Sequence, residues 1–122
     1  MSMKYQSEFF IETNNIDWHE PAPGLKRKFM GFNDDIMMVQ IHFEKGAIGA
    51  LHKHPHSQTT YVASGKFEVT IGSEKKVLHT NDGFFVPPDI EHSVLCLEEG
   101  ILVDTFSPIR EDFVSAIPDH KV

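Results

Sequence analysis

The strongest constraint on how this chain can fold is a period of two in its apolar residues. Between Met37 and Phe43 an apolar residue occupies every second position, and the same period returns between Phe67 and Ile71. Alternation of this kind is typical of β-strands that cover a core with one face. No segment shows a convincing helical period, and only 108–113 is expected to form a helical turn. The sequence therefore predicts a protein built from strands.

Turn residues divide the rest of the chain into short segments. The further strands expected between these turns are 59–63, 75–79, 84–86, 92–97 and 101–106. Gly65 marks a turn, and 98–100 is expected to join the last two strands as a hairpin. Eight or more short strands favour an all-β, closed or nearly closed antiparallel barrel or jelly roll, because closure removes exposed sheet edges.

Length and charge narrow the class of protein. A chain of 122 residues is expected to form one domain over 1–122, with an N-terminal extension at 1–24, a core over about 26–107 and a tail at 108–122. The net charge of −7 and the lack of a Lys/Arg block argue against nucleic acid as a partner. No apolar run approaches the ~20 residues of a membrane span. A cytoplasmic protein without membrane contact is expected.

Two expectations concern residues outside the main alternation. The lone Cys96 cannot form an internal disulfide and is expected to be a small core residue. Phe9, Phe10 and Ile11 are expected to form a short strand over 8–11. Such a strand could pair with the sheet of a second subunit, so a homodimer is predicted.

Histidines crowd into one stretch of the chain. His52, His54 and His56 are followed closely by Gln58, and His92 comes after a proline-rich turn. Imidazole is the commonest side-chain ligand for metals. This combination in a strand-rich chain favours a metal site, and a histidine-rich surface loop is the alternative.

Strand geometry requires a bend within this stretch. A straight strand from 52 to 58 would span ~20 Å at ~3.3 Å per residue. Residues so far apart cannot all approach one ion to the ~2 Å of a ligand bond. Pro55 is the expected place for the bend. After it, only some of His56, Ser57 and Gln58 can point back toward the first two histidines.

One carboxylate is expected inside the barrel. Leu102, Asp104 and Phe106 share one face of a strand, and the two apolar residues should face the interior. A buried carboxylate is costly unless it is paired or lies near a cation. Asp104 is then either a general acid or base beside the metal or a salt-bridged residue at the barrel mouth.

Three further residues are candidates for contact with a ligand. Arg110 could fold back over the barrel mouth, where its guanidinium suits a substrate carboxylate, or it could pair with Glu111 or Asp112. His56 could contact a substrate. Tyr61 could line the cavity or belong to the core.

Two segments of the chain resemble the two characteristic motifs of the cupin family. The first consists of Gly46, His52, His54, Gln58 and Gly65 at the family's spacing, and the second of Pro87, Asp89, His92 and Cys96. The family usually has Glu at the position of Gln58, Gly at that of Asp89 and Asn at that of Cys96. The resemblance implies a double-stranded β-helix, the jelly-roll barrel of cupins. It also implies one divalent transition metal bound by His52, His54, Gln58 and His92.

Gln58 changes the charge expected at this metal. Three neutral imidazoles and a neutral amide leave the positive charge of an ion uncompensated, which favours anionic ligands. This donor set also suits borderline ions better than Mg²⁺ or Ca²⁺. We expect Ni, Zn, Fe or Mn.

Within the cupins, the chain resembles the pectin-degradation KdgF group. The most specific part is the closing stretch from Val103 to Phe113, together with Gln58. Members of this group convert 4,5-unsaturated uronic acid monomers, released from pectin or alginate, to the linear 4-deoxy-5-keto uronate. The resemblance implies an acid or base at Asp104, a substrate-cavity aromatic at Phe106 and a substrate-binding arginine at Arg110.

These observations predict a metal-dependent enzyme that acts on a small anionic sugar acid, with Asp104 and Arg110 as its catalytic residues. Two alternatives are another cupin metalloenzyme, such as a dioxygenase or an isomerase, and a non-catalytic small-molecule-binding protein. Gln58 argues mildly against an oxygenase, because non-haem iron oxygenases commonly use a carboxylate ligand.

Overall fold

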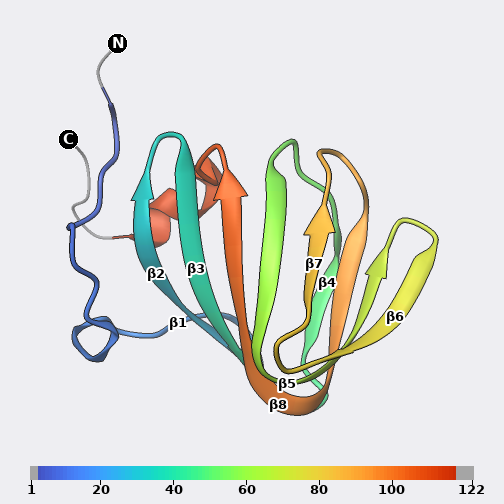
Figure 1. The fold of residues 1–122 in the computed structure, drawn as a ribbon. Helices are drawn as coiled ribbons and strands as arrows, with labels where there is room; N and C mark the ends of the chain where they lie inside the picture. The colour runs from blue at the N-terminus through green and yellow to red at the C-terminus, as the bar shows by residue number, and fades with distance from the viewer. Residues whose placement is uncertain (1–2, 118–122) are drawn as a thin grey trace.

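The structure, a computed structural model, describes residues 3–117, and these residues fold mainly into β-strands (Figure 1). The strands are β1 (His19–Ala22), β2 (Leu25–Asn33), β3 (Ile36–Phe43), β4 (Ile48–His52), β5 (Ser57–Ile71), β6 (Glu74–His79), β7 (Gly83–Val86) and β8 (His92–Ser107). Two short 3₁₀ helices flank them, η1 (Thr13–Asn15) and η2 (Glu111–Ala116). No helix of the described part of the chain is long and apolar enough to cross a membrane. The all-β expectation is confirmed.

The strands form two facing walls that share β5 and β8 (Figure 1). The first half of β5 pairs with the last part of β8 and with β7, and β3, β2 and β1 extend this wall beyond β8. The second half of β5 pairs with the first part of β8 and with β6, and β4 adds to β8. Because β5 and β8 run through both walls, their bend closes one end of a jelly-roll barrel.

The bend lies where two turns were predicted from sequence. Both predictions were wrong: β5 continues through Gly65, and β8 continues through 98–100 without forming a hairpin. Gly65 has φ +93°, a conformation that favours glycine, and the strand pairing shifts register around it. A Cβ on Gly65 would lie 2.7 Å from the Cα of Gly100, and one on Gly100 would overlap the carbonyl oxygen of Ser64. The two glycines therefore let two paired strands bend together.

The strand predicted over 8–11 is absent. These residues lie outside the named strands, and Phe9 and Phe10 are each 86% exposed. The N-terminal segment pairs with the end of β2 only before this stretch, where Gln6 bridges Asn33 and the Ser7 amide donates to the carbonyl oxygen of Phe32. The chain then bends at Phe9 and Phe10 instead of extending along β2. The homodimer remains a prediction, although the strand on which it was based is absent. The tail residues 118–122 lie outside the described residues.

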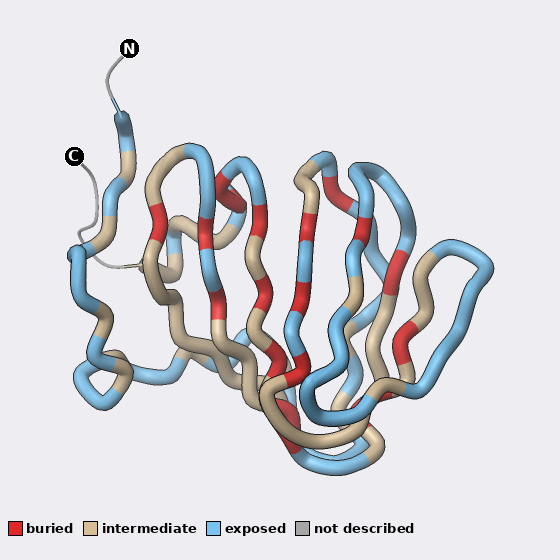
Figure 2. The backbone as a smooth tube through the Cα atoms, viewed as in Figure 1, coloured by how far each residue is buried: buried red, intermediate tan, exposed pale blue. Residues whose placement is uncertain are grey.

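The interior divides into two apolar clusters, and buried positions alternate with more exposed ones along β3, β5 and β8 (Figure 2). The first cluster lies beside the bend and consists of Phe43, Val62, Phe67, Val69, Cys96 and Leu102. The second lies between β2, β3, the end of β8 and the segment after it, and consists of Phe32, Met37, Val39, Phe106 and Ile109. Cys96 is 1% exposed, which confirms it as a core residue. A polar group of buried residues lies at the end of the barrel away from the bend.

Candidate metal centre

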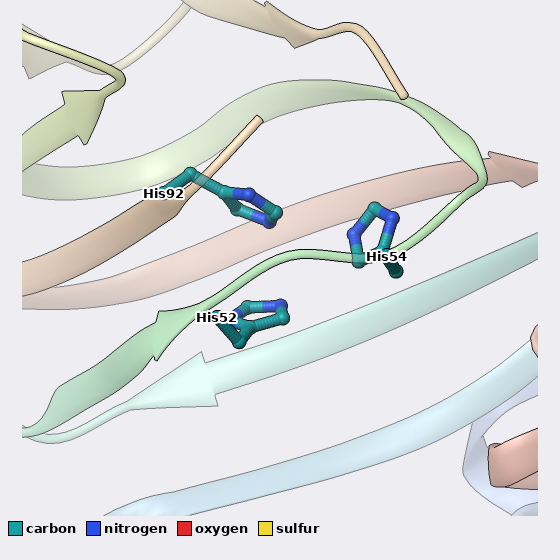
Figure 3. A group of neighbouring side chains, drawn as sticks. All are labelled: His52, His54 and His92. Carbon is teal, nitrogen blue, oxygen red and sulfur yellow. The ribbon is translucent and has the colours of Figure 1, made fainter. Parts of the chain in front are cut away.

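Three histidines from three segments converge at this end of the barrel (Figure 3). His52 ends β4 and is the register partner of His92, which begins β8. His54 follows β4 in the bend around Pro55, which separates β4 from β5 as predicted. The potential ligand atoms of the three rings lie within 4.8 Å of one another. The rings point toward a common space, so these histidines form a group that could hold a metal ion.

The second nitrogen of each ring orients it. The Nδ1 atoms of His52, His54 and His92 lie 2.8, 3.2 and 2.9 Å from backbone carbonyl oxygens. A carbonyl oxygen only accepts hydrogen bonds, so each Nδ1 carries the hydrogen and each Nε2 keeps its lone pair. Hydrogen bonds of this kind set the tautomer of metal-binding histidines. All three rings therefore present the nitrogen that a cation requires.

Gln58 adds an oxygen to this group. Its Oε1 atom lies 3.0 Å from Nε2 of His54, and the side chain is buried at 5% exposure. With the hydrogen of His54 on Nδ1, these two atoms are both acceptors. Nε2 of His92 is buried and has no hydrogen-bond partner among the described residues. A cation would satisfy all three lone pairs, so the four predicted residues fit the metal that the sequence implies.

Burial keeps two of the histidines neutral. The pKa of His54 is lowered mainly by desolvation and further by the positive charge of Arg110. Desolvation also lowers the pKa of His92 to about 4, with smaller contributions from His52 and His54. A metal ligand must be the neutral imidazole. Both rings are therefore in the ligating form at neutral pH without having to lose a proton.

Asp104 faces the interior, as its strand parity predicted. It is 6% exposed and lies on the same face of β8 as Leu102 and Phe106, which are each 2% exposed. Its Oδ1 accepts a 2.6 Å hydrogen bond from the hydroxyl of Thr60. Burial raises the pKa of Asp104 to about 6, although this hydrogen bond and the charge of Arg110 oppose the shift. An acid with such a pKa can both give and take a proton near neutrality.

Arg110 combines both arrangements considered from sequence. It folds back over the interior, where its guanidinium carbon lies 5.0 Å from the centre of the Phe106 ring and 4.1 Å from that of Phe113. It also forms a two-pronged ion pair with Asp112, at 2.9 and 2.6 Å. This pair lowers the pKa of Asp112. Arg110 is 7% exposed, and its positive charge contributes to the lowered pKa of His54 and of His92.

Two predicted ligand contacts lie outside the metal group. Nε2 of His56 lies 3.1 Å from the carbonyl oxygen of Ile109, and its ring centre is 5.4 Å from that of His54. His56 therefore flanks the three histidines. Tyr61 is 48% exposed, and its hydroxyl donates to Asn81. Residues 58 and 60 face inward, so the period of two turns residue 61 outward, and Tyr61 is not brought to the site.

Sequence reasoning missed Thr60 and Arg27. Thr60 is 4% exposed and bonds both Gln58 and Asp104. Its parity with Gln58 would have placed it inside. The guanidinium of Arg27 lies 4.2 Å from the centre of the Phe113 ring, on the same η2 segment that Arg110 contacts. No sequence signal connected Arg27 with that segment, because only the fold brings β2 against it.

A groove of about 560 Å³ lies elsewhere, between the N-terminal segment, β2 and the end of η2. Its walls include Phe10, Ile11, Trp18 and Phe29. It contains none of the four predicted metal ligands and neither Asp104 nor Arg110. The polar group inside the barrel is therefore a compact cluster of facing side chains that is separate from this surface groove.

Comparison with known proteins identifies the family. Residues 39–104 match the family described as "Cupin domain". The matched segment contains all four predicted metal ligands. The chain belongs to the cupin family. Its sequence is 49% identical over 108 residues to the pectin degradation protein KdgF of Dickeya dadantii, covering 87% of this chain and 97% of that protein.

Solved cupin structures agree with this assignment. An RmlC-like cupin from Shewanella frigidimarina is 48% identical with a TM-score of 0.87, covering 89% of this chain and 98% of the other. KdgF from a Halomonas species is 36% identical with a TM-score of 0.84, covering 88% and 99%. Oxalate decarboxylase of Bacillus subtilis, at 19% identity and a TM-score of 0.71, shares the fold alone. That match covers 88% of this chain and 30% of the decarboxylase chain. The predicted jelly-roll cupin fold is confirmed.

Proposed function

We propose that this cupin is a metal-dependent enzyme that opens the ring of 4,5-unsaturated uronic acid monomers and yields the linear 4-deoxy-5-keto uronate. The observation that carries the proposal is a buried carboxylate, Asp104, beside a set of electrically neutral ligands. The similarity to two proteins named KdgF, one described as a pectin degradation protein, supports the substrate class. The alternative functions, an oxygenase and a non-catalytic binding protein, would give different results in the same assay.

The metal would be held by His52, His54, Gln58 and His92. When bound, it supplies a Lewis acid whose charge is not neutralised by its ligands, and such a centre attracts an anion and polarises its oxygens. The donor set of nitrogens and one amide oxygen suits Ni, Zn, Fe or Mn.

The chain's own residues bind the substrate and move one proton. Arg110 lies at the interior surface and would hold the substrate carboxylate, for which a guanidinium is suited. Phe106 lies beneath it and offers an apolar wall to the sugar ring. Arg110 is already paired with Asp112, so the substrate carboxylate would compete with Asp112 for the guanidinium. A small monomer could reach the guanidinium beside Asp112 more easily than a longer chain.

Asp104 would act as the acid and base of the isomerisation. Its carboxylate takes the proton of the anomeric hydroxyl as the bond between carbon 1 and the ring oxygen breaks. The carbonyl of the aldehyde forms at carbon 1, and the ring oxygen leaves on carbon 5 as an enolate. The protonated Asp104 then gives the same proton to carbon 4 as the enolate becomes the ketone, so the isomerisation needs no oxidant. The pKa of Asp104, about 6, suits both directions of transfer near neutral pH.

The test is an assay with lyase-generated unsaturated uronate monomer. We expect the metal-loaded protein to accelerate the loss of the conjugated C=C absorbance over buffer containing the same metal, and the chelated protein to lose this effect. Tyr61→Phe is a matched control, because Tyr61 faces outward and should keep full activity. No acceleration by the metal-loaded protein would overturn the proposal. Binding of the monomer without turnover would identify a binding protein, and oxygen uptake would identify an oxygenase.

A further inference from the structure

A buried chain of hydrogen bonds joins the proposed fourth metal ligand to the proposed acid. Nε2 of Gln58 donates to the hydroxyl of Thr60 at 3.0 Å, and that hydroxyl donates to Oδ1 of Asp104 at 2.6 Å. The three side chains are 5%, 4% and 6% exposed. Thr60 lies two residues after Gln58 on the same face of β5 and is the register partner of Asp104 on β8. The pairing of these strands therefore builds the chain.

The direction of these hydrogen bonds determines how the Gln58 amide is oriented. A threonine hydroxyl has one hydrogen to donate, whereas a carboxylate can only accept. The hydrogen of Thr60 goes to Asp104, so Thr60 can offer Gln58 only a lone pair. The end of the amide that faces Thr60 must then be the NH₂ group. Oε1 is left facing Nε2 of His54, where the ligand atoms converge.

We propose that Thr60 is a positioning residue that selects which end of the Gln58 amide faces the metal. The two ends have nearly the same shape, so packing alone does not choose between them. A flipped amide would turn an NH₂ donor toward Nε2 of His54 and occupy the lone pair that a metal needs. Thr60 prevents the flip because its own hydrogen is committed to Asp104.

The same contact explains what an amide at position 58 adds to the site. A carboxylate there would offer two oxygens and no hydrogen, so Thr60 would face acceptors on both sides with one hydrogen to give. The amide supplies the missing donor. Gln58 can therefore ligate through one end and connect to Asp104 through the other. This inference rests on the metal centre of the proposed function and does not depend on the substrate or the reaction.

A double-mutant cycle tests the inference with Co²⁺ as the probe, measured by chelator competition and by its visible absorption bands. Thr60→Val keeps the shape and removes the hydroxyl. We expect it to weaken Co²⁺ binding by about tenfold and to change the absorption bands, as loss of an outer hydrogen bond to a metal ligand typically does. Thr60→Ser should restore both. In a Gln58→Glu background, where both ends of residue 58 are oxygens, Thr60→Val should cost less than about threefold.

Several outcomes would overturn the inference. Equal losses from Thr60→Val in the two backgrounds would show that Thr60 acts through packing alone. No loss in the wild-type background, or no recovery with Thr60→Ser, would also exclude the role. If circular dichroism shows that Thr60→Val is unfolded, Thr60→Ala repeats the cycle without the two methyl groups of valine.

The proposed function fails separately from this inference. A wild-type protein that binds no Co²⁺ would overturn the metal centre and the role of Thr60 with it. A protein that shows the expected cycle but does not convert unsaturated uronate would support the role of Thr60 and overturn the reaction.

Discussion

The barrel interior is built throughout by β5 and β8, and its two ends hold different inward residues. Beside the bend, these strands contribute Val62, Phe67 and Cys96 to an apolar cluster, the apolar half of the interior. At the end away from the bend, they contribute Thr60, Asp104 and His92 to a buried polar group, the polar half. The same pair of strands therefore positions both halves, and the chemistry of the inward side chains makes the first a core and the second a candidate site.

The polar half is costly in a way that the apolar half is not. Removing apolar area from water stabilises the fold, by about 25 cal/mol per Å². Burying Asp104 instead raises its pKa, which means that its ionised form is destabilised by the surroundings. Such perturbed groups are concentrated at functional sites. We therefore expect substitutions in the polar half to change activity, and substitutions in the apolar half to change stability.

Asp104→Ala should produce the largest effect in the polar half. Loss of the acid and base is expected to lower kcat/KM for unsaturated uronate by about 10³-fold, equal to about 4 kcal/mol of transition-state stabilisation. At saturating metal the protein should still bind the ion, measured by elemental analysis, because Asp104 is not among the ligands. Its affinity for the metal should fall, because the Thr60 hydroxyl is then free to donate to Gln58. A variant that loses its metal together with its activity would contradict this separation of roles.

Phe67→Ala is the corresponding change in the apolar half. Phe67 is 0% exposed, and its ring centre lies 5.2 Å from that of Phe43 in an edge-to-face contact. We expect a loss of about 3–4 kcal/mol in the free energy of unfolding, measured by urea denaturation, because truncation leaves a cavity. The kcat/KM of the fraction that remains folded should stay close to that of wild type. A specific loss of activity at full folding would show that the two halves are coupled.

Asp104→Asn should reveal the cost of the buried charge. In the metal-free protein the folded-state pKa of Asp104 is about 6, above its ordinary value of 3.8. Its contribution to stability is therefore present below pH 3.8 and is lost as the pH rises toward 6. The Asn variant lacks this loss, so at pH 7 it should be more stable than wild type by up to about 3 kcal/mol.

The measurement is urea denaturation of both proteins in a chelating buffer between pH 4.5 and 7.5. The difference in unfolding free energy between variant and wild type should grow over this range and level off above pH 6 to 7. A difference that does not change with pH would show that the Asp104 charge carries no cost in the folded protein.

Cys96→Ala is the smallest change and tests where the polar half ends. Cys96 occupies a position of the second cupin motif, yet its Sγ donates to the carbonyl oxygen of Glu98 at 3.1 Å, within the apolar cluster. Burial raises the pKa of its thiol, which keeps it uncharged. We expect a loss of about 1 kcal/mol in unfolding free energy. Co²⁺ affinity should remain unchanged, and a tenfold loss would extend the site to Cys96.

The errors of the sequence reasoning share a physical cause. Gly65 and the residues at 98–100 looked like turns because glycine is common in turns, but glycine is also needed where two backbones approach closely. The strand predicted at 8–11 has β-prone residues, but the N-terminal segment pairs with β2 only at Gln6 and Ser7 and bends before it can continue as a strand. In each case the conformational preference of the residues was read correctly. The prediction failed because the neighbouring strands, which the sequence does not show, decide what that preference is used for.

The sequence by itself determined the strands and the parity of their residues. The alternation along 36–43, the inward direction of Asp104 and the bend at Pro55 follow from local spacing, because side chains alternate strictly along a strand. The set of four candidate ligands came from the resemblance of the sequence to the two cupin motifs. The same alternation turns Tyr61 to the opposite face of the strand from Gln58, so the sequence already places Tyr61 outside the site.

Only the tertiary structure decided which inward residues meet. The register of β5 against β8 places Thr60 opposite Asp104, and the register of β4 against β8 places His52 opposite His92. The return of the chain after β8 brings Arg110 over Phe106 and aligns Phe113 with Arg27. Most of these contacts join residues that are 40 or more positions apart in the sequence. No local pattern encodes the register of strands at that separation, so it depends on the whole fold.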